Sequence, residues 1–236
     1  MSTDQPESVA KGIAAAVVAD GEVPTRAELE AAWPGWATGL DYVVAADGGA
    51  EGAERLGLGP DLVVGDMDSL GGASRVRLEA AGVPFQVWPA EKDASDLELA
   101  VQAALARDPS RLVLLGVFGG ERLDHALAGV VLLSLPELIG RDVVCLDARR
   151  RVRLLRGPSE VVLQGPSGDL VTLLPFGVDA QGVRTSDLAY PLHGERLRLG
   201  SSRGLSNVRI TARARVSLRA GLLLVIETHQ PTGGRP

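Results

Sequence analysis

The sequence predicts an α/β protein in which a doubly wound, mainly parallel sheet is followed by an all-β sandwich, with a barrel as the alternative to the sandwich. Over residues 13–148, apolar runs alternate with segments of helical periodicity, which is typical of a parallel sheet covered by helices. Beyond residue 148 the apolar segments are short and are separated by Gly, Pro and Ser, as in antiparallel sheets. We therefore expect two domains, at residues 1–148 and 149–236.

Strands of the first domain are expected in its apolar runs. They are, in chain order, residues 13–19, 42–46, 62–64, 83–88, 112–117 and 143–146. Residues 62–64 form an uninterrupted apolar run between Pro60 and Gly65, which is typical of a strand buried on both faces. Cys145 lies in the last of these strands, and we expect it to be a core residue rather than a nucleophile.

Helical segments separate these strands. Thr25 and Glu28 have the spacing of a capping box, which predicts that a helix begins there. Ser95 and Glu98 have the same spacing and precede a segment with one apolar face. The helices are expected at residues 29–33, 50–56, 74–81, 97–105 and 123–135.

The second domain is expected to contain strands without a helix of useful length. Strands are predicted at residues 161–163, 170–174, 197–199, 208–219 and 222–226. Residues 208–219 alternate apolar and polar side chains, which indicates either one half-buried strand or a pair of strands. The basic run Arg149–Arg151 is expected to be a solvated connector between the domains.

Composition excludes several classes of protein. The chain of 236 residues is 45% apolar and 23% charged, as ordinary globular proteins are. Its net charge of −6 argues against a nucleic-acid partner, and no apolar run is long enough to span a membrane. A single cysteine excludes an internal disulfide and fits a reducing compartment, and Met1–Gly12 lacks the apolar core of a secretory signal. A cytoplasmic protein is therefore expected.

Acidic residues follow several predicted strands of the first domain. They are Asp47, Asp66 and Asp68, Asp93 and Asp96, and Asp124. Because the carboxyl ends of parallel strands lie on one edge of a sheet, we expect these carboxylates to converge on one crevice. Asp66 and Asp68 stand two residues apart and would point to the same side of an extended segment. Such repulsion is relieved by a cation, so the pattern favours a Mg²⁺ site that also receives phosphates.

The acidic residues also have ordinary structural explanations. Residues 66–69 could form a polar turn, and Asp93 or Asp96 could cap the helix that follows. The sequence contains neither the P-loop nor the glycine motif of dinucleotide-binding proteins.

The glycine pairs and the residues that follow the second pair are similarly ambiguous. Gly48–Gly49 and Gly119–Gly120 could form tight turns, or could let a phosphate approach backbone N–H groups. His125 is expected on a helix surface or in the core, whereas the guanidinium of Arg122 is better suited to phosphate oxygens.

Five motifs, taken in order, resemble those of the thiamine pyrophosphokinase family. They are Ala-Asp-Gly-Gly-Ala at 46–50, Gly-Asp-Met-Asp-Ser at 65–69, Lys-Asp-Ala-Ser-Asp at 92–96, Arg-Leu-Asp-His at 122–125 and Gly-Ser-Ser-Arg-Gly-Leu-Ser-Asn at 200–207. The resemblance spans residues 14–226. It implies a homodimeric enzyme that moves the terminal diphosphate of ATP to the hydroxyethyl oxygen of thiamine, leaving AMP. The first domain would bind ATP and Mg²⁺, and the second domain would complete the thiamine pocket with the partner chain.

The resemblance also implies roles for individual residues. Asp66, Asp68 and Asp96 would hold the metal ion, and Asp124 would orient or deprotonate the alcohol. The catalytic residues implied in this way are Asp66, Asp68, Asp96, Arg122 and Asp124. Those implied in nucleotide binding are Asp47, Gly48, Gly49, Lys92, Asp93, Arg122 and His125. Those implied in thiamine binding are Ser202, Ser206 and Asn207.

The sequence departs from the family pattern at several positions. Glu121 stands between the glycine pair and Arg122, and Gly129 stands where family members often have Asn. No Trp occurs beyond Trp88, so Tyr190 and Phe176 are the aromatic residues available in the second domain besides His193.

These departures keep two alternatives open. The first is a pyrophosphokinase of the same fold that acts on another heteroaromatic alcohol, such as a pterin. The second is a non-catalytic ligand-binding or sensor protein that keeps the metal site.

Overall fold

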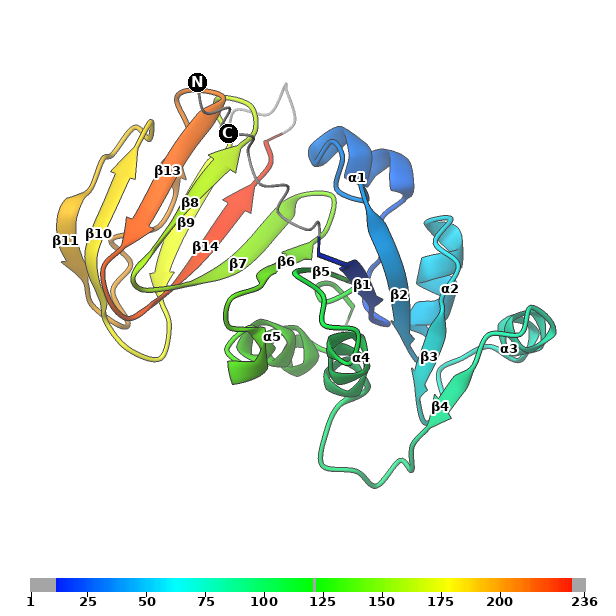
Figure 1. Cartoon of the computed structure of the whole chain (residues 1–236). Helices are drawn as coiled ribbons and strands as arrows, with labels where there is room; N and C mark the ends of the chain where they lie inside the picture. Colours follow the sequence, from blue (N-terminus) through cyan, green and yellow to red (C-terminus); the bar gives the residue numbers. More distant parts are fainter. Residues whose placement is uncertain (1–11, 121, 231–236) are drawn as a thin grey trace, which may run out of the picture.

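The computed structural model describes residues 12–120 and 122–230, which form an α/β half and a β-sandwich half (Figure 1). The strands of the α/β half are β1 (Ala14–Val18), β2 (Leu40–Ala46), β3 (Leu62–Gly65), β4 (Phe85–Val87), β5 (Arg111–Leu115) and β6 (Asp142–Leu146). Its helices are α1 (Arg26–Ala32), α2 (Gly49–Arg55), α3 (Gly72–Ala80), α4 (Asp96–Leu105) and α5 (Leu123–Leu132), with a short 3₁₀ helix at Pro136–Leu138. The strands of the sandwich half are β7 (Arg150–Arg156), β8 (Ser159–Gln164), β9 (Leu170–Pro175), β10 (Ala180–Ser186), β11 (His193–Leu197), β12 (Asn207–Val208), β13 (Arg213–Leu218) and β14 (Leu222–Thr228).

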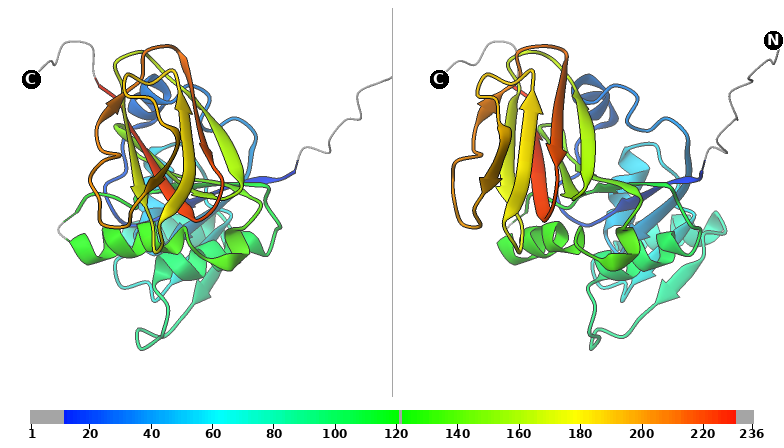
Figure 2. Two further views of the ribbon diagram at one scale, coloured as in Figure 1. Left: turned by 90° about the vertical axis from the view of Figure 1, so that its left-hand side faces the viewer. Right: turned by 60° about the vertical axis from the view of Figure 1, so that its left-hand side comes forward.

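One sheet of ten strands runs through both halves, in the order β12-β9-β14-β7-β6-β5-β1-β2-β3-β4. Strands β1 to β6 pair in parallel, and the direction of winding reverses between β1 and β5. Strand β7 joins β6 in antiparallel fashion, and a second sheet, β11-β10-β13-β8, covers the sandwich half (Figure 2). The fold class predicted from the sequence is confirmed.

The parallel strands are buried on both faces. Ala15 and Val17 of β1 belong to a core that includes Leu99 of α4, whereas Val18 belongs to a core that includes Leu29 of α1. Helices α4 and α5 therefore cover one face of the sheet, and α1 and α2 cover the other (Figure 1). Within the described residues, none of the helices has both the length and the apolar character needed to cross a membrane.

The sandwich core lies between the two sheets and follows the alternation of its strands. In β13, the buried residues Val216 and Leu218 face this core. Strand β14 departs from alternation because both of its faces are covered: Leu223 packs in the sandwich core, and Leu224 packs in the core beneath α4 and α5.

The predicted solvated connector at Arg149–Arg151 is wrong, because β7 begins at Arg150. The Nε and Nη2 atoms of Arg151 donate to Glu227 at 2.6 and 2.7 Å. Glu227 is fully buried and also accepts a hydrogen bond from the fully buried Arg209. A basic run thus enters the sheet because a carboxylate 76 residues away neutralises it.

Several predicted segments have different bounds. The helix expected to reach residue 135 ends at Leu132, and the strand expected at 83–88 is confined to Phe85–Val87. A strand was expected at 197–199, but the observed strand, β11, lies earlier in the chain and ends at Leu197. Residues 208–219 contribute to two strands, β12 and β13, which belong to different sheets. The domain boundary at 148/149 stays a prediction, and it falls between β6 and β7.

Replacement of Glu227 with glutamine is expected to destabilise the protein strongly. The change leaves the fully buried Arg209 and the partly buried Arg151 without a neutralising carboxylate, and breaking a buried pair costs about 3–5 kcal/mol. Urea unfolding followed by circular dichroism measures the loss.

The matched control is Glu160→Gln, which removes a carboxylate from the exposed pair with Arg215. This variant should unfold almost as the wild type does, because exposed pairs contribute little. A Glu227→Gln protein as stable as Glu160→Gln would show that the buried network does not hold the sheet.

Candidate metal centre

Three carboxylates converge beyond the carboxyl ends of β2 and β3. One oxygen of each of Asp47, Asp66 and Asp68 lies within 4.8 Å of the others. Asp47 directly follows β2, and the other two follow β3, its parallel neighbour. The expectation that acidic residues of neighbouring strands meet at one edge is met by these three.

The backbone around this carboxylate trio requires unusual conformations. Gly65 has φ +150°, and a Cβ at this position would lie 3.0 Å from the Cβ of Asp47 and 3.1 Å from Oδ1 of Asp96. Asp47 and Met67 themselves have positive φ values of 45° and 68°. Backbone strain of this kind is frequent at functional sites, and here it brings the carboxylates together.

Asp47 is the most buried member of the trio, with 3% of its surface exposed. Its Oδ2 accepts a hydrogen bond from the Ser69 N–H at 3.3 Å, whereas its buried Oδ1 has no hydrogen-bond partner among the described residues. Burial, reinforced by the charges of Asp68, Asp96 and Asp66, raises the pKa of Asp47 to about 6. A buried, unpartnered carboxylate oxygen beside two other carboxylates fits the requirements of a hard cation.

Lys92 supplies the positive charge at this edge. Its Nζ lies 2.9 Å from Oδ2 of Asp66 and 3.1 Å from Oδ1 of Asp96. The hydrogen bond from Lys92 lowers the pKa of Asp66. Burial acts against the charge of Lys92, but the hydrogen bonds to both carboxylates outweigh it and raise its pKa.

The predicted metal set of Asp66, Asp68 and Asp96 stays a prediction. The structure pairs Asp96 with Lys92 and places Asp47, which was assigned to the nucleotide, among the converging oxygens. Asp93 is exposed in the loop before α4, and Ser95 caps that helix by accepting the Glu98 N–H.

Asp20 is an additional acidic residue at this edge that sequence reasoning missed. Burial raises its pKa, and the charges of Glu51 and Asp68 act in the same direction. It follows β1 as Asp47 follows β2, and this shared position after a strand was the available signal.

The glycines of the Gly48–Gly49 turn are required because neighbouring atoms leave no room for a side chain. A Cβ on Gly48 would lie 2.4 Å from Oδ1 of Asp20, and one on Gly49 would lie 2.1 Å from the Val18 carbonyl oxygen. The contact of these glycines with phosphate stays a prediction.

The motif at the start of α5 lies on the surface. Arg122 donates to both carboxylate oxygens of Asp124, at 2.9 and 2.7 Å, and holds the pKa of that carboxyl well below its usual range. His125 is exposed, and Glu121 lies outside the described residues. Gly129 packs against Val117, two residues beyond β5, since a Cβ there would lie 2.4 Å from its Cγ1. The asparagine common in the family would therefore not fit without a shift.

The motif in the sandwich half divides into exposed and buried residues. Ser202 and Ser206 are exposed, whereas Asn207 is buried. The Asn207 amide accepts from the Tyr190 N–H at 3.0 Å and donates to the Tyr190 carbonyl oxygen at 2.7 Å. Asn207 therefore fixes the backbone of Tyr190, whose side chain is 69% exposed, while Phe176 packs against a core.

Comparison with protein families matches both halves of the chain. The family model for the catalytic domain of thiamin pyrophosphokinase matches residues 36–138. The model for the vitamin B1 binding domain of thiamin pyrophosphokinase matches residues 160–223. A thiamine pyrophosphokinase of Bacillus subtilis (strain 168) is 28% identical over 172 residues, which cover 73% of this chain and 80% of that protein.

Solved structures are similar over nearly the whole chain. The crystal structure of thiamine pyrophosphokinase from Bacillus subtilis has a TM-score of 0.80 at 25% identity and covers 92% of this chain and 99% of that one. A thiamin pyrophosphokinase family protein from Enterococcus faecalis has a TM-score of 0.76 at 26% identity, with the same coverage. Thiamin pyrophosphokinase from Candida albicans, at 14% identity, a TM-score of 0.75 and coverage of 92% and 90%, shares the fold.

Replacement of Asp47 with asparagine is expected to stabilise the metal-free protein at neutral pH. Because the pKa of Asp47 is raised from 3.8 to about 6, the folded protein holds a proton in this interval that the unfolded chain releases. The stabilisation that this bound proton gives to the folded state is complete at pH values below the pKa of Asp47 in the unfolded chain. It is lost as the pH rises through the pKa of Asp47 in the folded protein. Urea unfolding in EDTA should show Asp47→Asn more stable by about 1–3 kcal/mol near pH 7.5, and level with wild type towards pH 4.

Asp179→Asn is a control with the opposite sign. The Leu199 N–H and the Arg196 guanidinium lower the pKa of Asp179, so this variant should be less stable than wild type at neutral pH and approach it in acid. A stability difference for Asp47→Asn that does not change with pH would contradict the raised pKa.

Proposed function

We propose, because the chain belongs to the thiamin pyrophosphokinase family, that it transfers the terminal diphosphate of ATP to the hydroxyethyl oxygen of thiamine and releases AMP. The observation that carries this proposal is the carboxylate trio with Lys92 beside it at the carboxyl edge of the parallel sheet. Diphosphoryl transfer depends mainly on positioning and on neutralising phosphate charge, and this edge offers groups for both.

Asp47, Asp66 and Asp68 are the residues that would hold a magnesium ion. They offer hard oxygen ligands within 4.8 Å of one another, and Oδ1 of Asp47 finds no hydrogen-bond donor in the described part of the chain. When bound, Mg²⁺ would neutralise negative charge on the phosphates of ATP. Lys92 carries its charge into the same region, with only 10% of its side chain exposed.

Arg122 and Asp124 would act together on the phosphates and the acceptor. The pair is exposed, and exposed ion pairs are held weakly, so Arg122 can exchange Asp124 for a phosphate oxygen. While Arg122 holds it, Asp124 is a poor base because its pKa is lowered. Release of Arg122 would restore the basicity of Asp124, which could then orient or deprotonate the alcohol.

Tyr190 is the aromatic side chain best placed to meet the acceptor. Its ring is exposed, and its backbone is fixed by Asn207 at the end of the 200–207 motif. Thiamine carries a permanent cation, which is attracted to an aromatic face. Ser202 and Ser206 are exposed in the same motif and would offer hydroxyl groups.

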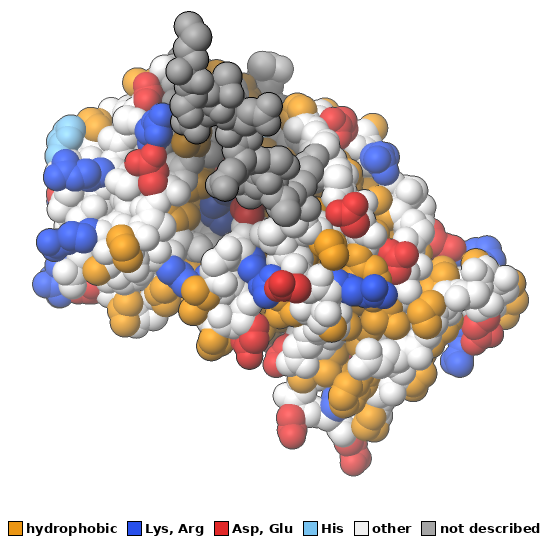
Figure 3. Space-filling view, in the orientation of Figure 1, with side chains coloured by type: hydrophobic (Ala, Val, Ile, Leu, Met, Phe, Trp, Pro, Cys, Tyr) orange, Lys and Arg blue, Asp and Glu red, His pale blue; other side chains and the backbone are white. Residues whose placement is uncertain are grey.

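Helix α5 supplies an apolar stripe that would contact a second copy of the chain. Leu123, Leu127 and Val131 stand four residues apart and are 71%, 58% and 53% exposed. Figure 3 shows that hydrophobic side chains also reach the surface elsewhere on the α/β half. A stripe of this kind on one helix face is typical of an interface.

Asp68→Asn is expected to lower the rate of thiamine diphosphate formation by about 100-fold or more, because the site loses a charged oxygen ligand. Purified protein is incubated with Mg²⁺, ATP and a panel of alcohols that includes thiamine and a hydroxymethylpterin, and products are identified by mass. AMP without ADP is the expected nucleotide product.

Asp108→Asn is the matched control, since Asp108 is 87% exposed beside Arg141 and has a positive φ that asparagine tolerates. It should retain wild-type activity. Turnover of the pterin alone, binding of thiamine without turnover, or full activity in Asp68→Asn would overturn the proposal.

Leu127→Glu is expected to convert a dimer into a monomer, because it places a charge in the centre of the α5 stripe. Size-exclusion chromatography with light scattering gives the mass. Val76→Glu alters a 65% exposed apolar residue on α3 and should leave the dimer intact. A monomeric wild type, or a dimeric Leu127→Glu, would exclude α5 as the interface.

A further inference from the structure

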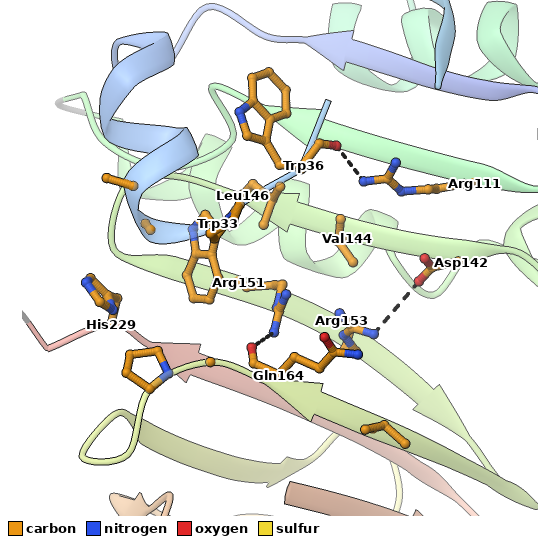
Figure 4. Close-up of a pocket in the computed structure, with 17 residues that line it drawn as sticks. Trp33, Trp36, Arg111, Asp142, Val144, Leu146, Arg151, Arg153, Gln164 and His229 are labelled. Carbon is orange, nitrogen blue, oxygen red and sulfur yellow. Dashed lines mark hydrogen bonds and ion pairs between the residues drawn. The ribbon is translucent and has the colours of Figure 1, made fainter. Parts of the chain in front are cut away.

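A cavity of about 480 Å³ lies between the two halves of the molecule (Figure 4). The α/β half contributes residues 31–36 at the end of α1, together with side chains of β5 and β6. The sandwich half contributes side chains of β7 and β8, residues 165–166 and His229. No member of the carboxylate trio lines the cavity, so it is separate from the candidate metal centre.

The lining of the cavity combines apolar side chains with arginines, because β6, with its apolar residues, lies between β5 and β7, which carry the arginines. Trp33, Val144 and Leu146 are among the apolar lining residues. Arg111, Arg151 and Arg153 reach the cavity from β5 and β7, and in the close-up Arg151 and Arg153 lie along the same strand (Figure 4). A cavity of this size with apolar lining residues and a few polar groups is typical of small-molecule sites.

The three arginines differ in how well their charges are compensated. Arg151 is neutralised by Glu227 and lies 4.6 Å from the centre of the Trp33 ring. Arg111 donates to the carbonyl oxygens of Trp36 and Thr38, and no carboxylate pairs with it in residues 12–120 and 122–230.

Arg153 is the least satisfied of the three. Its side chain is 16% exposed, and it approaches only Asp142, at 3.8 Å, whose carboxylate is 57% exposed. Its Nε is buried and finds no acceptor in the part of the chain that the structure describes. Burial lowers the pKa of Arg153, and the charges of Arg151 and Arg111 act in the same direction, whereas the carboxylates of Glu227 and Asp142 oppose the shift without cancelling it. Such a guanidinium is stabilised by an oxyanion that accepts its N–H groups.

We propose that this cavity binds a small organic anion, with its phosphate or carboxylate group at Arg153 and Arg111 and its apolar ring against Trp33 and Val144. Among the lining residues three arginines outnumber the one carboxylate, that of Asp142, which favours an anion. The apolar lining residues favour an organic anion over an inorganic one. Since the lining comes from both halves, binding also stabilises the contact between them.

The tryptophans provide a direct readout of binding. The chain has three, and Trp33 and Trp36 line the cavity, whereas Trp88 lies beyond β4. In a Trp88→Phe background, the fluorescence therefore comes from the two cavity tryptophans alone. Titrations are carried out in EDTA, without thiamine, so that neither the metal centre nor catalysis contributes and failure of the proposed reaction does not affect the outcome.

Four probes separate the features of the ligand. AMP carries a phosphate and a ring, benzoate carries a carboxylate and a ring, inorganic phosphate lacks a ring, and adenosine lacks the charge. Saturable fluorescence changes are expected with AMP or benzoate, and the successful class identifies the anion. No saturable change with either probe up to about 10 mM, or equal binding of adenosine, overturns the proposal.

Two variants test whether the arginines of the cavity bind the probe. Arg153→Met should weaken binding of the successful probe at least 10-fold, about 1.4 kcal/mol. Gln164→Glu adds a negative charge to the lining without a change of size and should weaken binding of the same probe several-fold. This variant keeps the test available if Arg153→Met does not fold. Arg213→Met, an exposed site on β13, should bind as the background does. The proposal is overturned if Gln164→Glu binds the probe as tightly as the background does, or if Arg213→Met loses as much affinity as the cavity variants. Either result would show that the arginines of the cavity do not bind the probe.

Discussion

The antiparallel pairing of β7 with β6 joins the two halves into one sheet, and the positions of the remaining elements depend on it. Its register places Val152 opposite Cys145, and Arg151 opposite Leu146. Successive strand residues point to opposite faces, so Val152 enters the core beneath α4 and α5 while Arg151 faces Trp33. A slip of one residue would reverse both faces, because the side-chain period of a strand is two.

Arg151 is partly buried at this junction, and its charge requires an anion on the neighbouring strand. Strand β14 supplies it, since Glu227 is the direct partner of Arg151 across the β14–β7 pair. The same carboxylate receives Arg209. A buried ion pair contributes little net stability compared with apolar packing, but a mismatched register would leave its charges uncompensated. The network therefore acts mainly by excluding other registers of β7 and β14.

Parts of the fold were predictable because their signals are local. Strands such as β1 and β5 are continuous apolar runs, and the Thr25–Glu28 capping box forms as predicted. Strand β10 was missed because its inward residues, Ala180, Val183 and Thr185, are separated by polar ones and include a threonine. The entry of Arg150 and Arg151 into β7 depends on Glu227, a contact that no local pattern reveals.

The candidate site was predictable in its location and less so in its pairings. That carboxylates meet at the carboxyl edge follows from parallel topology, whereas the partner of each depends on side-chain geometry. Lys92 and Asp96 are four residues apart, but Lys92 precedes α4, so the helical i,i+4 rule did not predict their ion pair. Asp20 stood after a strand like the others, with Glu22 two residues further on, so its place at this edge was as readable from the sequence as that of Asp66 and Asp68.

The two sites lie at different places on the same sheet, which limits how one could affect the other. The arginine-lined cavity receives Arg111 and Asp142 from the amino ends of β5 and β6, whereas the trio follows the carboxyl ends of β2 and β3. The strand between them, β1, is buried, and close-packed interiors of this kind have low compressibility and transmit strain. The cavity is lined by both halves, and Tyr190 and residues 200–207 belong to the sandwich half. A cavity ligand would therefore reach the acceptor side of the reaction through the orientation of the sandwich half, and it could reach the metal centre only through the packed strands of the parallel sheet.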